Sequence, residues 1–397
     1  MRSVPFLQRL ERQPGMQADA KPASRPVDPG LSSEFHRWPL PGYVWPALEK
    51  HSQSIFCTEP HLRIHGSLTS DIEAWVMRRD GRIAGLWLFR RHGRKACVLN
   101  EVMAASVSEV EQFADALFAR FSELDVIELH AVHLVDEQTR HPALRTRYAP
   151  QLRRMPTPSS ALDDSEMPGM EEAQGGDAPS RPTARPWQRA CVSEDFVLAL
   201  PASVDDWHAS LSARTREKLR QCLRRAQRGE PTLSFRVFND ADISEHQVRA
   251  VLKMSRARMR AKGRTYGMDA REERRLCALM RERGQLAAIE VDGHMRAGLL
   301  CTLAGNDVYM HVIAHDPAFD ELRLGYLCCI LCIEAAIAQR MHRFHFLWGW
   351  YDYKVRLGGQ RQTLEHALLW RSRVAASRHP LMLLRQQWLS LKSALRE

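Results

Sequence analysis

Residues 286–314 are the most informative segment of the chain and read LAAIEVDGHMRAGLLCTLAGNDVYMHVIA. Three apolar runs, 286–291, 295–303 and 307–314, are separated by Asp292-Gly293 and by Gly305-Asn306. Dipeptides of this kind favour tight hairpin turns because Gly, Asn and Asp accept positive φ angles. The segment therefore predicts a meander of three antiparallel strands.

Helical patterns lie on both sides of this meander. After a polar loop, an apolar helix is expected over 322–340, followed by strands at 343–348 and 364–370. Before the meander, three helices are expected, each preceded by capping residues: 212–228 after Ser212, 243–260 after Asp242 or Ser244, and 270–283 after Asp269. The C-terminal half thus has the order β-β-β-α-β.

The N-terminal half shows the same order in a shorter form. Strands are expected at 74–79 and 83–90 around Asp80-Gly81, and at 95–99 and 126–131, with a helix at 107–122 between the last two. Because the two halves share few residue identities, we interpret this as a degenerate internal duplication at the level of topology.

The composition divides the chain into segments. Residues 156–186 contain six Pro, three Gly and six acidic residues and no Phe, Tyr, Trp, Val or Ile, which predicts a flexible linker. We therefore expect a disordered arm at 1–33, an N-terminal domain at 34–155, the linker at 156–186, a C-terminal domain at 187–376 and a helical tail at 377–397.

Length and charge exclude several classes of protein. The chain has 397 residues, 44% of them hydrophobic and 26% charged, which excludes collagen-like and wholly disordered proteins. The net charge of +10 favours anionic partners, although only eight of the 57 basic residues are Lys, an Arg bias typical of GC-rich genomes. Nine irregularly spaced Cys and no apolar run of membrane-spanning length indicate a cytoplasmic protein without a membrane span.

Metal-binding patterns are weak. Cys329 and Cys332 form a CxxC motif inside the apolar helix without a second pair, which favours core packing. His61 and His65 have helical ligand spacing but no nearby carboxylate. We predict no bound metal.

The start of the apolar helix is a candidate anion site. Unpaired N–H groups at a helix N-terminus bind phosphate, and here Arg323 and Gly325 lie at that start. Arg323 could pair with a phosphate and Gly325 would allow a close backbone approach. The alternative is that Gly325 only packs the helix against the sheet.

The C-terminal half resembles the GNAT acyltransferase superfamily over residues 196–371. Within it, the half is similar to the CelD/BcsL-like cellulose-biosynthesis branch, which is itself similar to the Fem aminoacyltransferases. The resemblance rests on the following residues in order: the basic helix 212–225, Val291-Asp292-Gly293, Asp316-Pro317 before Gly325, Phe344 to Gly349, and Tyr353-Lys354.

The resemblance implies two tandem GNAT-like domains, each an α/β (α+β) unit with a mixed, largely antiparallel sheet flanked by helices. It also implies direct transfer of an acyl group, in the first instance acetyl, from acyl-CoA to an amine or a hydroxyl. The residues predicted to bind the cofactor are Arg323, Gly325, Tyr326, Lys354, Val312 and Ala314. The family's phosphate loop usually reads Gln/Arg-x-x-Gly-x-Gly/Ala, and here only Arg323-x-Gly325 remains.

Direct acyl transfer needs a base for the acceptor's proton, a donor for the oxyanion and an acid for the thiolate. Glu290 and His311 are the candidate bases, and backbone N–H groups near Val312 to Ala314 are the candidate oxyanion donors. Tyr353 is the candidate acid or orienting group. The N-terminal copy has Glu101 to Ser106 without Gly before its helix, so we predict a structural or acceptor-shaping role for it.

The leading hypothesis is therefore an acyltransferase acting on a small molecule or a glycan precursor, in polysaccharide or cell-envelope biosynthesis. Two alternatives remain open. The first is Fem-like transfer from aminoacyl-tRNA, favoured by seven basic residues between Ser212 and Arg228. The second is a scaffold in which both copies have lost the cofactor site. The oligomeric state is left open.

Overall fold

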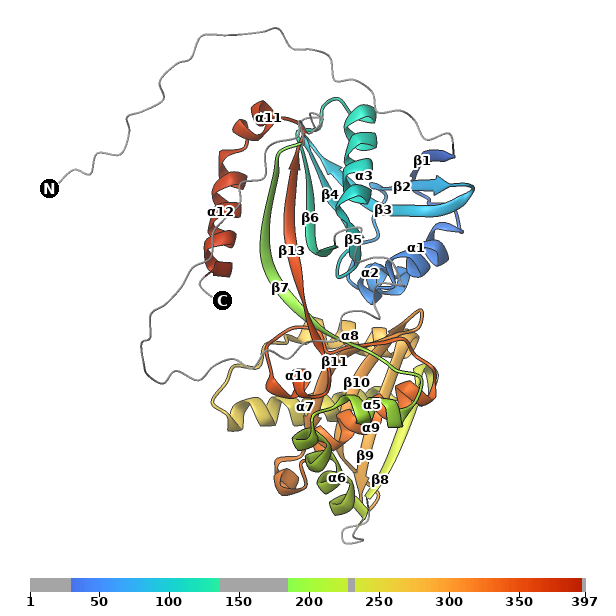
Figure 1. Ribbon diagram of the computed structural model, residues 1–397, viewed down its shortest axis with the longest axis vertical. Coiled ribbons are helices and arrows are strands. Elements are labelled where there is room, and N and C mark those ends of the chain that lie inside the picture. The colour runs from blue at the N-terminus through green and yellow to red at the C-terminus, as the bar shows by residue number, and fades with distance from the viewer. Residues whose placement is uncertain (1–29, 136–184, 228–232, 395–397) are drawn as a thin grey trace, which may run out of the picture.

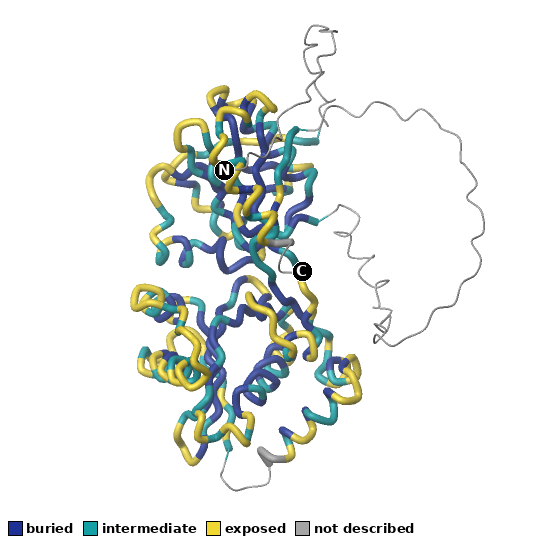
Figure 2. Tube along the Cα trace, turned by 90° about the vertical axis from the view of Figure 1, so that its left-hand side faces the viewer, coloured by how far each residue is buried: buried dark blue, intermediate teal, exposed yellow. Residues whose placement is uncertain are grey.

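The computed structural model describes residues 30–135, 185–227 and 233–394, and a single mixed sheet of 13 strands runs through this part of the chain (Figure 1). The strand order is β1-β2-β3-β4-β6-β13-β7-β12-β11-β10-β9-β8, and β5 pairs with β6. Buried residues follow the strands, whereas exposed residues follow the outer helices and loops (Figure 2). Two units of similar build share this sheet.

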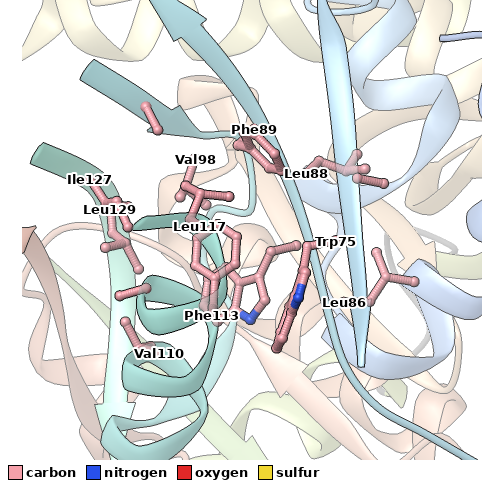
Figure 3. Packing of buried hydrophobic residues seen from close by; sticks show 14 of the residues in the cluster. Trp75, Leu86, Leu88, Phe89, Val98, Val110, Phe113, Leu117, Ile127 and Leu129 are labelled. Carbon is pink, nitrogen blue, oxygen red and sulfur yellow. The ribbon is translucent and has the colours of Figure 1, made fainter. Parts of the chain in front are cut away.

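The N-terminal unit contains a meander and one long helix. Its strands are β1 (Leu31–Arg37), β2 (Ile72–Arg79), β3 (Arg82–His92), β4 (Lys95–Val98), β5 (Ala104–Ser106) and β6 (Val126–Val135). Its helices are α1 (Val44–Ser52), α2 (Glu59–Ile64) and α3 (Val107–Arg120). In Figure 3, Phe113 and Leu117 of α3 pack against Trp75 and Phe89 of the meander.

The C-terminal unit repeats this plan with more helices. Its strands are β8 (Leu233–Asn239), β9 (Gly284–Val291), β10 (His294–Ala304), β11 (Asp307–His315) and β12 (Arg343–His345). Its helices are α5 (Val204–Ser210), α6 (Ala213–Gln227), α7 (Glu245–Ala261), α8 (Ala270–Arg283), α9 (Leu324–Ala338) and α10 (Asp352–Arg356). Helix α9 covers one face of the meander, and α7 and α8 cover the other.

Two long strands, β7 (Trp187–Ala199) and β13 (Gln360–Trp370), connect the units. They pair with each other along ten positions, from Gln360 opposite Val197 to Leu369 opposite Trp187. At one end β13 also pairs with β6, and at the other end β7 pairs with β12. The last strand of the C-terminal half therefore completes the N-terminal sheet.

The C-terminal segment forms α11 (Arg373–Ser377) and α12 (Pro380–Ala394). Along β13, Ala367 and Leu369 belong to the core beneath α3, whereas Leu368 and Trp370 pack against the two C-terminal helices. Because strand residues alternate between faces, α11 and α12 lie on the face opposite α3. Of the described helices, none is long and apolar enough to cross a bilayer.

The predicted fold class is confirmed: each unit combines a largely antiparallel part of the sheet with flanking helices. The predicted meander is observed as β9, β10 and β11, with Asp292 and Gly293 at φ angles of 50° and 76°. Ser244, not Asp242, caps α7 through a capping box with Gln247, and Asp269 caps α8 in the same way with Glu272.

Some elements were not predicted. Strand β1 begins at Leu31, so residues 31–33, assigned to the arm, pair with Arg79 to Met77 of β2. Strand β7, helices α1 and α2 and the short strand β5 were also missed. The arm up to residue 29 and the linker up to residue 184 lie outside the described residues, and the domain boundaries stay predictions.

Candidate functional site

A cleft opens where β11 and β12 diverge. The two strands are parallel and pair only from Asp307 to Tyr309, opposite Arg343 to His345. Strand β11 continues to His315, whereas β12 ends at His345. The edge of β11 beyond residue 309 therefore faces the cleft instead of a neighbouring strand.

The cleft has a volume of about 830 Å³ and gathers most of the predicted site residues. It is lined by six of the nine: His311, Val312, Arg323, Gly325, Tyr326 and Tyr353. They come from β11, from the first turn of α9 and from α10. The structure therefore brings these three segments together at one cleft, and the roles of their residues stay predictions.

The first turn of α9 forms one end of this cleft. Arg323 precedes the helix in a left-handed conformation, with φ 52° and ψ 40°, and no side chain caps the helix. A Cβ at Gly325 would lie 2.8 Å from Nδ1 of His315, so this position requires glycine because β11 approaches so closely. The N-terminal N–H groups of α9 thus remain open to a ligand, and Gly325 also serves packing.

The wall of the cleft is strongly positive. The described lining contains six cations, Lys218, Arg258, Lys262, Arg264, Arg323 and Arg356, and two acids, Glu272 and Asp320. Among the described residues, only Arg356 of these cations has a carboxylate partner within ion-pair distance, Asp352 at 3.2 Å. Neighbouring Arg258, followed by burial and Arg264, lowers the pKa of Lys262, as expected where cations crowd without counter-charges.

A second cleft of about 440 Å³ adjoins the first and reaches the N-terminal unit. Both clefts are lined by His311, Glu272, Trp348, Tyr351 and Tyr353, among others. The N-terminal unit contributes Phe56, His61 and His65 to the second cleft. The described part of the chain has no cluster of three or more His, Cys, Asp or Glu residues arranged to hold a metal.

His311 lies at the junction of the two clefts. Its Nε2 is hydrogen-bonded to Oγ1 of the buried Thr302 at 2.7 Å. Burial, with a smaller contribution from His65, lowers the pKa of His311 to about 4. The imidazole is therefore neutral at pH 7 and can accept a proton.

Two tyrosines border the same space. Burial raises the pKa of Tyr326 to about 12 and that of Tyr353 further still. The hydroxyl of Tyr353 has no hydrogen-bond partner among the described residues, and its ring packs edge-on against Phe346. Tyr353 therefore presents a protonated, uncommitted donor to the cleft.

Comparison with known proteins bears on this geometry. Residues 213–355 match the family described as Acetyltransferase (GNAT) domain. The matched segment spans about a third of the chain and is similar to a GNAT acetyltransferase domain. It contains β11, α9 and α10 up to Val355, and so it holds all nine predicted site residues. The prediction of a GNAT-type transferase is confirmed at the level of this domain.

One solved structure shows a similar fold over more of the chain, and two others align with lower scores. The crystal structure of FemX has a TM-score of 0.56 at 10% identity and covers 89% of this chain and 100% of FemX. A tandem GNAT protein from the clavulanic acid biosynthesis pathway has a TM-score of 0.36 at 11% identity, covering 85% and 98%. L-PGS from Bacillus licheniformis has a TM-score of 0.40 at 10% identity, covering 77% and 86%. No curated protein sequence matches the chain.

Lys354 of the GNAT domain lies elsewhere than predicted. It does not line the cleft that holds Arg323 but borders the second cleft, and it is 1% exposed. Its Nζ donates to the carbonyl oxygens of Leu347 at 2.8 Å and of Trp348 at 2.7 Å, and burial lowers its pKa to about 8. Lys354 thus fixes the loop after β12.

Glu290 and Ala314 also differ from expectation. Glu290 lines neither cleft, because β10 separates its strand β9 from β11, and its carboxylate accepts a hydrogen bond from Ser234. Ala314 is packed in the core beneath α7 and α8. Among the candidate bases, the geometry therefore retains His311.

His345 lies at the last paired position of β12, where β11 and β12 begin to diverge. Its Nδ1 is hydrogen-bonded to Asp195 at 2.6 Å, and its ring stacks on Tyr309 at 4.2 Å. Burial opposes its charged form, yet Asp195 and Asp307 raise its pKa overall. The Tyr309 hydroxyl in turn donates to the carbonyl oxygen of Gln53 in the N-terminal unit. This buried group holds both units at the closed end of the cleft.

Proposed function

We propose that this protein transfers an acyl group from an acyl-CoA to an amine acceptor by direct attack. The observation that carries the proposal is the cleft between β11 and β12. There an uncapped helix start meets His311, Tyr353 and five cations that have no carboxylate partner in the described part of the chain. A hydroxyl acceptor would use the same groups. Acetyl-CoA is the simplest donor of this kind, and we assign it as the first candidate.

The residues present fit an acyl-CoA. The open N–H groups of α9 and the Arg323 guanidinium suit a pyrophosphate, and Lys218, Arg258 and Lys262 offer charge to further phosphate. When bound, the thioester would supply an activated acyl carbonyl. The unpaired edge of β11 offers backbone N–H groups to stabilise the developing oxyanion.

The remaining steps fall to two side chains. With Nε2–H of His311 donating to Thr302, the lone pair on Nδ1 can take the proton of the attacking amine. The Tyr353 hydroxyl can then donate a proton to the leaving thiolate. Both residues line both clefts, so they would stand between donor and acceptor.

The acceptor would enter through the second cleft. Phe56, His61 and His65 from the N-terminal unit form part of its wall, which supports an acceptor-shaping role for that unit. Glu272 is the acidic residue that both clefts share, and it would attract a protonated amine. An amino-bearing small molecule or glycan precursor fits these groups, and a role in envelope or polysaccharide biosynthesis remains part of the proposal.

Calorimetric titration with acetyl-CoA and longer acyl-CoAs tests the donor. We expect saturable binding that weakens with added salt, since phosphate contacts are screened. Dephospho-CoA serves as the control ligand, and it should bind more weakly than CoA because it lacks one phosphate. Absence of binding by every acyl-CoA would overturn the proposal.

A second readout separates catalysis from binding. Tyr353→Phe should lower kcat by about 100-fold while KM for acyl-CoA stays within a small factor, because only the proton donor is removed. Unchanged kcat in this variant would reject the role of Tyr353. Binding of acyl-CoA without any turnover on a panel of amines would favour the scaffold alternative.

Transfer from aminoacyl-tRNA is the second candidate, and the fold similarity to FemX along 89% of the chain together with the unpaired cations favours retaining it. Binding of tRNA at low salt with steep salt dependence would support it. Acyl-CoA turnover without tRNA binding would exclude it.

A further inference from the structure

Helix α12 is docked with polar groups facing the sheet. Gln386 is 2% exposed, and its side chain is hydrogen-bonded to Nδ1 of His366 at 2.6 Å and donates to the His366 carbonyl oxygen at 3.0 Å. Ser390 donates to the carbonyl oxygen of Arg189 at 3.4 Å. Met382 and Leu383 add apolar contacts to the small core around Trp370.

The opposite face of α12 is apolar and exposed. It carries Leu381, Leu384, Trp388 and Leu391, exposed by 80%, 60%, 57% and 66%. Their spacing of three, four and three residues places all four on one side of the helix. We call these four residues the outer stripe. Large apolar residues gathered on the outer side of a helix are typical of a surface that contacts a protein or a membrane.

The charges around the outer stripe indicate the nature of this partner. Residues 373–394 contain Arg373, Arg378, Arg385 and Lys392 and no Asp or Glu. Arg378 and Arg385 lie 3.4 Å and 3.8 Å from Asp125 and Glu128. Among the described residues, Arg373 and Lys392 have no carboxylate within ion-pair distance, and Nζ of Lys392 lies 4.9 Å from the centroid of the Trp388 ring.

We propose that α12 binds the surface of an anionic lipid bilayer, with the outer stripe inserted among the lipids. Leu and Trp on one face with Lys and Arg beside them are the composition of helices that lie in a membrane interface. A second copy of this chain fits less well. Helix pairs are stabilised by acidic and basic residues that flank the apolar seam, and α11 and α12 offer no acid.

This proposal does not depend on the proposed chemistry. It places the protein at a membrane surface, whatever group its GNAT domain transfers. Acceptors that are themselves embedded in lipid would then be accessible to the enzyme.

Vesicle sedimentation of the full chain tests the proposal. The probes are phosphatidylcholine vesicles with and without phosphatidylglycerol. We expect the full chain to sediment with the anionic vesicles, and the double variant Leu384→Gln, Leu391→Gln to bind about tenfold more weakly. The matched control is Gln387→Ala, an exposed polar position on the same helix, which should bind like the unaltered chain.

Two further measurements keep the outcome unambiguous. Because the outer stripe is exposed, the double variant should keep its thermal unfolding midpoint, and a marked fall would show that the stripe packs within the molecule and overturn the proposal. Lys392→Ala should weaken binding to anionic vesicles only. Failure of the unaltered chain to bind anionic vesicles overturns the proposal, as does a dimer that dissociates in the double variant without any vesicle binding.

Discussion

Helices α3 and α9 follow the meander of their respective units, and they begin in opposite ways. In α3, Oγ of Ser106 accepts a hydrogen bond from the backbone N–H of Glu109 at 3.1 Å, and the buried Glu109 is bonded to His51. In α9, Arg323 stands at the start, no side chain caps the helix, and the first turn contains no acid. One helix start is filled and anionic, whereas the other is open and cationic.

The difference between the two helix starts affects how well each could accept an anion. A carboxylate in the first turn occupies the favourable field of the helix dipole and repels another anion. In the N-terminal unit, the Ser106 side chain caps the start of α3 and so stabilises the fold. In the C-terminal unit no side chain caps the equivalent groups.

The strongest loss of activity is expected from a change in the third strand of a meander. β11 presents His311 to the clefts, whereas β4 carries Lys95 paired with Glu128 at 2.8 Å. His311→Gln should lower kcat/KM by about 100-fold because the proton acceptor is lost. Lys95→Ala, the matched change in the other unit, should leave kcat/KM unchanged.

The pH profile refines this prediction. Burial lowers the pKa of His311 to about 4, so the base stays unprotonated well below the ordinary value near 6.5. The rate should therefore fall only as the pH drops towards 4, where His311 gains a proton. An acid limb of kcat/KM centred near pH 6.5 would contradict the assignment of His311 as the base.

The next effect reverses the charge at the start of α9. Arg323→Asp gives α9 an acidic start like that of α3 and should weaken binding of acetyl-CoA by about 100-fold. Arg323→Gln, which removes the cation without adding an anion, should weaken it by about tenfold. Calorimetric titration measures both. Equal affinities for the two variants would show that the helix start does not contact phosphate.

A smaller effect is expected at the filled helix start. Ser106→Ala removes the cap of α3 and should destabilise the protein by about 1 kcal/mol. Denaturant unfolding measures this change. Binding of acetyl-CoA should stay the same, and a parallel loss of binding would place a ligand in the N-terminal unit instead.

The smallest effect concerns the backbone of Arg323. Its φ of 52° is unfavourable for a residue with a Cβ, and Arg323→Gly would relieve this cost. Glycine also makes the unfolded chain more flexible, which opposes the gain. The net increase in the free energy of unfolding should be about 0.5 kcal/mol. The gain should appear as a higher thermal midpoint together with weaker acetyl-CoA binding. Lower stability would mean that the arginine side chain supports the fold.

Elements specified by residues close together in the sequence could be predicted, whereas strands specified by pairing with distant segments could not. The meander at 286–314 was predictable because Asp292-Gly293 encodes a tight turn within a few residues. Strand β7, with the mixed sequence WQRACVSEDFVLA, has no clear alternation and is specified by its pairing with β13, about 170 residues away.

The site followed the same rule. Arg323, Gly325 and Tyr326 could be grouped from the sequence because they adjoin one helix start, and His311 because it lies on the preceding strand. Their roles stay predictions. Glu290 lines neither cleft, because β10 lies between β9 and β11, and a strand pattern does not reveal this order. Phe56 was missed because it reaches the second cleft from another unit, and His61 and His65 drew notice only as metal ligands.

The exchange of β7 and β13 between the units has a consequence for biosynthesis. Strand β6 ends at Val135, but its partner β13 begins at Gln360, so the ribosome must add more than 200 residues before the N-terminal sheet can be completed. Until then β6 has an unpaired edge that can associate with other chains. Nascent chains that stop before Gln360 should therefore aggregate or be degraded. The two units should also remain encoded in one chain, because the N-terminal sheet needs β13.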